Sequence, residues 1–238
     1  MKSLLIGMGF AFAFVASVIA QQPAATVQTP SNPNLPPLFF TETWKQTGPE
    51  RDVDNQVLTN ANLELKLYGP TAKQIQIAPT TPNTRQDPPN LWTGICDGPV
   101  AATLRDKNNY VDLTGRAKIR WQTRSAGFHV VRPMLKLADG TFLVGDHVDG
   151  DGSTENFVES EFSISSVRWL KLDANTVTTV HAERSKPPEI GRWVEHPDLS
   201  KVDEVGFADL MPGSGHGWGG FVNVGRIDVY GAPVKRQF

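Results

Sequence analysis

The chain has 238 residues, of which 39% are hydrophobic and 20% are charged, and its formal net charge at pH 7 is −2. This balance argues against nucleic acid or an anionic membrane surface as a partner, because both need a basic surface. Cys96 is the single cysteine, so no intrachain disulfide can form and a packed core has to stabilise the fold.

The N-terminus has the features of a secretory signal peptide. Lys2 supplies a positive charge, the run from Leu4 to Ala20 carries no charge, and Val18 and Ala20 occupy the positions that a signal peptidase reads. We expect residues 1–20 to be removed and the protein to be secreted or to stay in the periplasm or cell envelope. The alternative is a membrane anchor, but the apolar run is at the short limit of a bilayer span. No later segment is apolar enough to span.

A proline-rich segment follows. Gln21 to Pro37 holds five prolines and no charge. Proline lacks an amide donor and fixes φ, so this composition predicts an extended linker rather than a helix or a strand. The remaining residues, 38–238, fit a single domain.

Short runs of alternating polar and apolar residues recur along this domain, and no long stretch has the 3.6-residue apolar period of an amphipathic helix. Apolar runs on both sides of Asp139-Gly140 predict a hairpin. One short helical turn is expected at Pro197 to Val202. Together these features predict an all-β fold, an antiparallel β-sandwich or barrel. The predicted strands lie at Asn62–Tyr68, Gln74–Ile77, Ala117–Gln122, Phe157–Ile164, Val167–Asp173 and Val222–Tyr230.

Two stretches carry a family resemblance. Val111 to Trp121 (VDLTGRAKIRW) resembles the turn-then-strand segment of galactose-binding-like jelly rolls, and His196 to Phe207 followed by RIDVYG resembles the end of such domains. Asp112 and Asp198 can cap the turns that follow them, while the adjacent leucines, Leu113 and Leu199, fill the core. The resemblance implies a jelly-roll sandwich of the kind found in carbohydrate-binding modules and in accessory domains of secreted glycan enzymes. The whole chain is also similar to a group of secreted bacterial proteins.

The glycine-rich stretch Met211 to Gly220 (MPGSGHGWGG) is the main candidate site. No Lys-Ser/Thr pair follows the glycines and a strand comes next, so a phosphate-binding loop is excluded. Trp218 offers a flat apolar face for a sugar ring, His216 and Asp209 offer hydrogen bonds, and Gly217 lets the backbone approach a ligand. The alternative is a flexible connection between the last strands.

An acidic, turn-rich stretch precedes Phe157. Calcium prefers six to eight oxygen ligands, and Asp149, Asp151 and Glu155 could supply some of them. The spacing departs from the EF-hand pattern, and a solvated hairpin loop is the alternative.

The residues that could support catalysis are few. Glu159 and Glu161 share one strand face and could act as an acid–base pair in glycoside cleavage, although a solvated face is favoured, with Val158, Ser160 and Phe162 pointing inward. The five histidines lack zinc-site spacing, and no serine nucleophile elbow is present. Cys96 is expected to be a buried apolar residue.

Three functions remain open. The first is a glycan-binding module that uses Trp218, His216 and nearby polar groups. The second is an envelope structural or interaction protein without a small ligand. The third is a glycoside hydrolase or polysaccharide lyase, which the lack of a recognisable acid–base constellation disfavours. The tryptophans outside the glycine-rich stretch are expected to pack in the core or at its rim, with one or two exposed: Trp44, Trp92, Trp121, Trp169 and Trp193.

Overall fold

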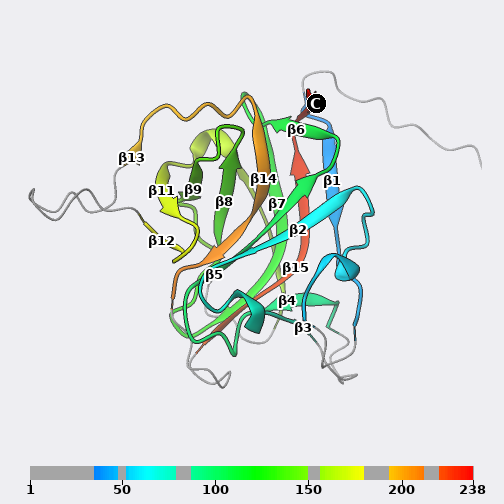
Figure 1. Cartoon of the computed structure of the whole chain (residues 1–238), viewed down its shortest axis with the longest axis vertical. Coiled ribbons are helices and arrows are strands. Elements are labelled where there is room, and N and C mark those ends of the chain that lie inside the picture. The colour runs from blue at the N-terminus through cyan, green and yellow to red at the C-terminus, as the bar shows by residue number, and fades with distance from the viewer. Residues whose placement is uncertain are drawn as a thin grey trace, which may run out of the picture. The chain divides into compact units, whose positions relative to one another are not determined.

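The computed structural model consists almost entirely of β-strands joined by turns and loops (Figure 1). It describes residues 35–47, 52–78, 87–149, 156–179, 193–211 and 220–237, so the predicted signal peptide and most of the predicted linker lie outside it. The strands form two antiparallel sheets with one hydrophobic core between them. The predicted antiparallel β-sandwich of the jelly-roll type is therefore confirmed.

The first sheet, sheet A, is built around β15, the longest strand. Its order is β10-β7-β15-β4-β3, and β1 pairs with the second half of β15. Along β7 every second side chain is buried, including Ile119, Trp121 and Thr123, so this face of sheet A is turned toward the core. The strands are β1 (Leu38–Glu42), β3 (Gln76–Ala78), β4 (Asn90–Trp92), β7 (Lys118–Ala126), β10 (Val158–Ser163) and β15 (Phe221–Tyr230).

The second sheet, sheet B, has the order β12-β11-β9-β8-β14-β5-β2. Strand β13 pairs with β11, β6 pairs with β14, and β16 pairs with β6. Single 3-10 turns lie at η1 (Asn55–Val57), η2 (Ala72–Gln74) and η3 (Ile164–Ser166). The strands are β2 (Leu63–Tyr68), β5 (Val100–Asp106), β6 (Asn109–Asp112), β8 (Arg132–Leu137), β9 (Phe142–Gly145), β11 (Trp169–Asp173), β12 (Thr178–Thr179), β13 (Trp193–Val194), β14 (Val202–Asp209) and β16 (Ala232–Lys235).

Several local predictions are confirmed. Strands β8 and β9 form the hairpin expected around Asp139-Gly140. Asp112 accepts a hydrogen bond from the Thr114 amide (2.8 Å) and Asp198 from the Ser200 amide (3.0 Å), as capping side chains do. Cys96 is buried, and burial together with Asp209 raises the pKa of its thiol to about 12, so the thiol is neutral and inert at pH 7.

Two local predictions are wrong. Pro197 to Val202 forms a turn and not a helical turn, because the Lys201 carbonyl accepts a ladder hydrogen bond from Ala138 (3.0 Å) and Val202 already belongs to β14. Val158 is exposed instead of facing the core. It is the first residue of β10, which lies at the edge of sheet A and pairs with β7.

The side of sheet B that is turned away from the shared core, here called the outer face, has a second apolar cluster. Tyr68 and Phe142 meet there with ring centroids 5.0 Å apart, although four strand spacings, about 19 Å on a flat sheet, separate their strands. Sheet B must therefore curl strongly around this face. Val177, buried and at φ 50°, closes the cluster from the β11–β12 turn, in a backbone conformation that costs a β-branched residue energy.

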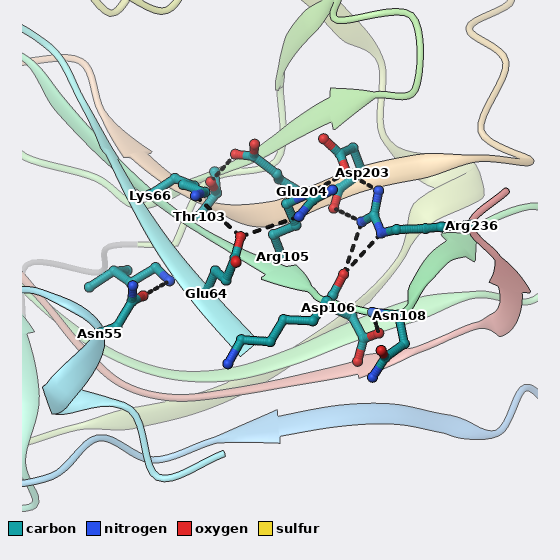
Figure 2. A network of polar contacts seen from close by, with 12 residues as sticks. Asn55, Glu64, Lys66, Thr103, Arg105, Asp106, Asn108, Asp203, Glu204 and Arg236 are labelled. Carbon is teal, nitrogen blue, oxygen red and sulfur yellow. Dashed lines mark hydrogen bonds and ion pairs between the residues drawn. The ribbon is translucent and has the colours of Figure 1, made fainter. Parts of the chain in front are cut away.

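Ion pairs lock the C-terminal end of the described chain onto sheet B (Figure 2). Arg236 contacts Asp203 (2.5 Å) and donates to the Asp106 carbonyl (3.0 and 3.1 Å). Arg105 lies between Asp203 (3.0 Å) and Glu64 (3.2 Å). These charges neutralise one another, so we interpret this network as structural.

A buried carboxylate organises the loop that follows β1. Glu42 is fully buried and accepts hydrogen bonds from the amides of Thr43, Trp44, Thr59 and Asn60 and from the Thr59 hydroxyl, at 2.7–3.1 Å.

We expect Glu42→Gln to lower the free energy of unfolding by about 2 kcal/mol, because the side-chain NH2 of the new glutamine would face backbone N–H groups that also donate. Urea denaturation would measure it. Glu159→Gln, on the exposed side of β10, is the control and should change stability by less than about 0.5 kcal/mol.

Candidate functional site

The glycine-rich stretch can be placed only at its two ends. Trp218, His216 and Gly217 lie outside the described residues. Asp209 ends β14 and is buried; its carboxylate accepts from the Thr93 hydroxyl (2.9 Å) and lies 2.7 Å from the His129 imidazole. A Cβ at Gly220 would come within 2.4 Å of His129, so this imidazole touches both ends of the stretch. Among the described residues, the partners of the Asp209 carboxylate are therefore side chains of the same domain.

The predicted calcium ligands are also only partly described. Asp149 accepts hydrogen bonds from the Trp121 indole and the Ser160 hydroxyl, and the His147 imidazole lies 3.3 Å from it. Asp151 and Glu155 lie outside the described residues. Among those that are described, no three His, Cys, Asp or Glu side chains gather in a way that could hold a metal ion.

Glu159 and Glu161 lie on the solvated side of β10, as favoured from the sequence. Both are exposed, and they pair with Arg120 (3.9 Å) and Lys118 (2.9 Å) of β7. Exposed, ion-paired carboxylates lack the apolar surroundings of a general acid. In the described ranges, no helix is both long enough and apolar enough to cross a bilayer.

A different group of side chains, which the sequence did not indicate, lies together along one end of sheet B. Arg132 of β8 pairs with Ala208 of β14, the Asp146 amide donates to the Arg168 carbonyl (2.9 Å), and Trp193 of β13 pairs with Leu170 of β11. Because side chains alternate along a strand, this register puts Arg132, Asp146, Arg168 and Trp193 on the outer face. We call these four residues the Arg–Trp strip. Figure 1 shows the four strands that carry it or flank it, β8, β9, β11 and β13.

Arg168 is held in place at the centre of the strip. Its Nε donates to one Asp146 oxygen and its backbone amide to the other, each at 2.8 Å. Burial alone would raise the pKa of Asp146, but the hydrogen bonds and charge of Arg168 outweigh it and hold that pKa below its ordinary value. The Arg168 guanidinium lies 4.3 Å from the centre of the Trp193 ring, a cation–π contact. Asp146, Arg168 and Trp193 thus hold one another in place.

Trp193 and Arg168 line a pocket of about 520 Å³, within the size range of small-molecule sites. The Trp193 side chain remains 41% exposed there. His196 and Ser165 add polar groups to the lining. Trp169, also in the lining, is buried, and its indole N–H has no acceptor among the described residues. The pocket therefore combines an exposed aromatic surface with several hydrogen-bonding groups.

A second pocket, of about 700 Å³, lies around η2. Its described lining has no aromatic side chain and includes Asp52, Lys73 and Gln74, and Gln74 already bonds to Asp97. It offers less than the Trp193 pocket for recognition of a sugar ring, which needs a flat apolar surface.

The tryptophans largely follow the prediction. Trp44, Trp121 and Trp169 are buried, Trp92 is half-buried, and Trp193 is exposed. The expected one or two exposed tryptophans therefore include Trp193, which the sequence did not single out. Its position between charged neighbours in the sequence, Arg192 and Glu195, was the one available signal that its ring meets solvent.

No family model and no curated protein matches this chain. Solved structures do. The family 11 carbohydrate-binding module of the cellulosomal cellulase Lic26A-Cel5E of Clostridium thermocellum is 15% identical, covers 81% of this chain and 100% of its own, and has a TM-score of 0.40. The carbohydrate recognition domain of Emp47p is 9% identical, covers 85% of this chain and 99% of its own, and has a TM-score of 0.37. At these values the similarity concerns the sandwich fold and carries no argument about a ligand.

Proposed function

We propose that this protein binds a carbohydrate chain, with Trp193 as the platform for a sugar ring. The observation that carries the proposal is the exposed indole of Trp193 in a pocket that also holds hydrogen-bonding groups. Sugars present apolar C–H faces that pack on aromatic rings, while their hydroxyl groups need donors and acceptors close by. Arg168, Ser165 and His196 supply such groups around the ring.

The glycine-rich stretch belongs to the same proposal. Trp218, His216 and Gly217 would form a second contact for the glycan, and Asp209, which is buried and bonded to Thr93 and His129, would support the stretch at its base instead of touching the sugar. The stretch leaves β14 next to Ala208, which pairs with Arg132 of the Arg–Trp strip, so it starts at the same end of sheet B. A calcium ion held by Asp149, Asp151 and Glu155 stays a separate proposal, as does secretion directed by residues 1–20.

We expect affinity electrophoresis to show retardation of residues 21–238 in gels that contain a recognised soluble polysaccharide. Trp193→Ala should weaken binding about tenfold or more, because removal of a central aromatic contact costs on the order of 2 kcal/mol. Phe128→Ala removes an aromatic ring that is more exposed but lies outside this pocket, and it should leave the retardation unchanged.

Parallel gels would separate the alternatives. Loss of retardation in Trp218→Ala but not in Trp193→Ala would move the platform to the glycine-rich stretch. Loss with a chelator would support the calcium proposal. Free migration of the wild-type protein through neutral and charged polysaccharides alike would contradict carbohydrate binding and favour an envelope structural role.

A further inference from the structure

Arg132 has unused binding capacity. This side chain is half-buried, and among the described residues its Nη1 donates only to the carbonyls of Gly145 and Asp146, both at a long 3.4 Å. A guanidinium carries five N–H donors. Burial lowers the pKa of Arg132 against the attraction of Asp146 that raises it, the direction expected for a cation that loses water without gaining a full counter-charge.

The other arginines of similar burial differ from Arg132. Throughout the described ranges, no carboxylate lies within 4.0 Å of the Arg132 guanidinium, whereas every other buried or half-buried arginine has one. A buried cation without a neighbouring anion lowers the stability of a fold, so proteins avoid one unless a function requires it. The paired arginines are Arg105, Arg120, Arg124, Arg226 and Arg236.

The nearest acid cannot neutralise Arg132. Asp146 already accepts two hydrogen bonds from Arg168, its closest partner in the strip. Two guanidinium groups therefore share one carboxylate. Glu195, exposed on the rim of the Trp193 pocket, lies beyond Arg168 in the strand order and not beside Arg132. Counting the described residues, the part of the Arg–Trp strip next to β14 has a net positive charge.

We propose that the carbohydrate bound here is anionic and that Arg132 binds its carboxylate or sulfate group. This inference rests on the proposed function. A planar guanidinium matches a carboxylate or a sulfate with two parallel hydrogen bonds, so the free donors of Arg132 fit either group. Trp193 lies on β13, three strand spacings or about 14 Å from β8, so the charged group and the ring on Trp193 belong to different sugars of one chain.

The test compares three polymers by isothermal titration calorimetry on residues 21–238: polygalacturonate for carboxylate, dextran sulfate for sulfate, and dextran as the neutral probe. We expect at least one anionic polymer to bind about tenfold or more tightly than dextran. Arg132→Gln, which keeps polar bulk but loses the charge, should abolish this preference. Arg132→Lys, which keeps the charge but loses the planar fork, should restore only part of it.

Arg116→Gln is the matched control, because it removes the same charge from an exposed position in the β6–β7 turn. An equal loss of the preference for anionic polymers in Arg132→Gln and Arg116→Gln would mean that this preference is non-specific charge attraction, which would overturn the inference. Equal affinity for dextran and the anionic polymers, with binding lost in Trp193→Ala, would also overturn it while the proposed function stands. Binding of no polymer would contradict the proposed function itself, and binding insensitive to Trp193→Ala would exclude Trp193 as its platform and overturn the inference that rests on it. Thermal unfolding of each variant would confirm that it is folded.

Discussion

Lys136→Met should lower the free energy of unfolding by about 3 kcal/mol, because it leaves a buried carboxylate without its cation. Glu204 of β14 is only 1% exposed, and the Lys136 ammonium lies 2.9 Å from it on the neighbouring strand β8. The hydroxyls of Tyr68 and Thr103 also donate to Glu204, at 2.7 and 2.5 Å. Burial and this carboxylate together raise the pKa of Tyr68 well above its ordinary value, as a negative charge on Glu204 requires.

Urea denaturation of wild type and Lys136→Met would measure the loss. Lys66→Met is the control: Lys66 pairs with Glu64 at 3.2 Å on the edge strand β2, where both side chains are partly exposed, and its loss should cost less than about 1 kcal/mol. Equal losses in both variants would contradict the distinction drawn between these ion pairs.

Gly206→Ala should destabilise the protein by about 3 kcal/mol or more, because sheet B has no room for a side chain at this point. A Cβ at Gly206 would come within 2.0 Å of the Ala102 carbonyl oxygen and 2.5 Å of the Thr103 Cα, both in the backbone of β5. Backbone in a central strand cannot move aside as a side chain could, so the cost exceeds ordinary overpacking. Chemical denaturation would give the loss, and the far-UV spectrum would report whether the sheet survives.

Gly115→Ala is the matched substitution. Its backbone φ is +65°, but a Cβ there would meet nothing within 4 Å, so only the left-handed conformation is penalised, by about 1 kcal/mol. If Gly206→Ala lowers the free energy of unfolding by no more than Gly115→Ala does, β5 and β14 separate easily. This result would then contradict the tight curl inferred from the contact between Tyr68 and Phe142.

Much of the fold was predictable because local patterns and tertiary packing agree. The alternation along Ala117–Gln122 reflects one buried and one more exposed side of β7, and the apolar positions of Val222–Tyr230 enter the core from β15, although that strand is buried on both sides. The turns at Asp112 and Asp198 follow from side-chain capping alone. Strand order did not follow from such signals, since β14 pairs with β5 and β8, which are far from it in the sequence and selected only by packing.

The Arg–Trp strip was not predictable for a related reason. Arg132 and Asp146 each look like an ordinary polar residue at a strand end, and only the register of β8, β9 and β11 puts them beside Arg168. The outer apolar cluster was hidden too, because Met134 and Val144 lie in strands that are buried on both faces and so lose the polar alternation. Whether an aromatic side chain is exposed depends on its neighbours in space, which the sequence pattern does not give.

The contact of Asp209 with Thr93 and His129 has a consequence for how this protein can change over evolutionary time. These side chains fasten the end of β14 to β4–β5 and β7–β8 connections, and His129 reaches Gly220 at the start of β15. The sandwich thereby secures both attachment points of residues 212–219 with side chains from elsewhere in the chain. Any replacement of that stretch, by mutation over time or by a library in the laboratory, would therefore begin and end on backbone that the rest of the chain already holds.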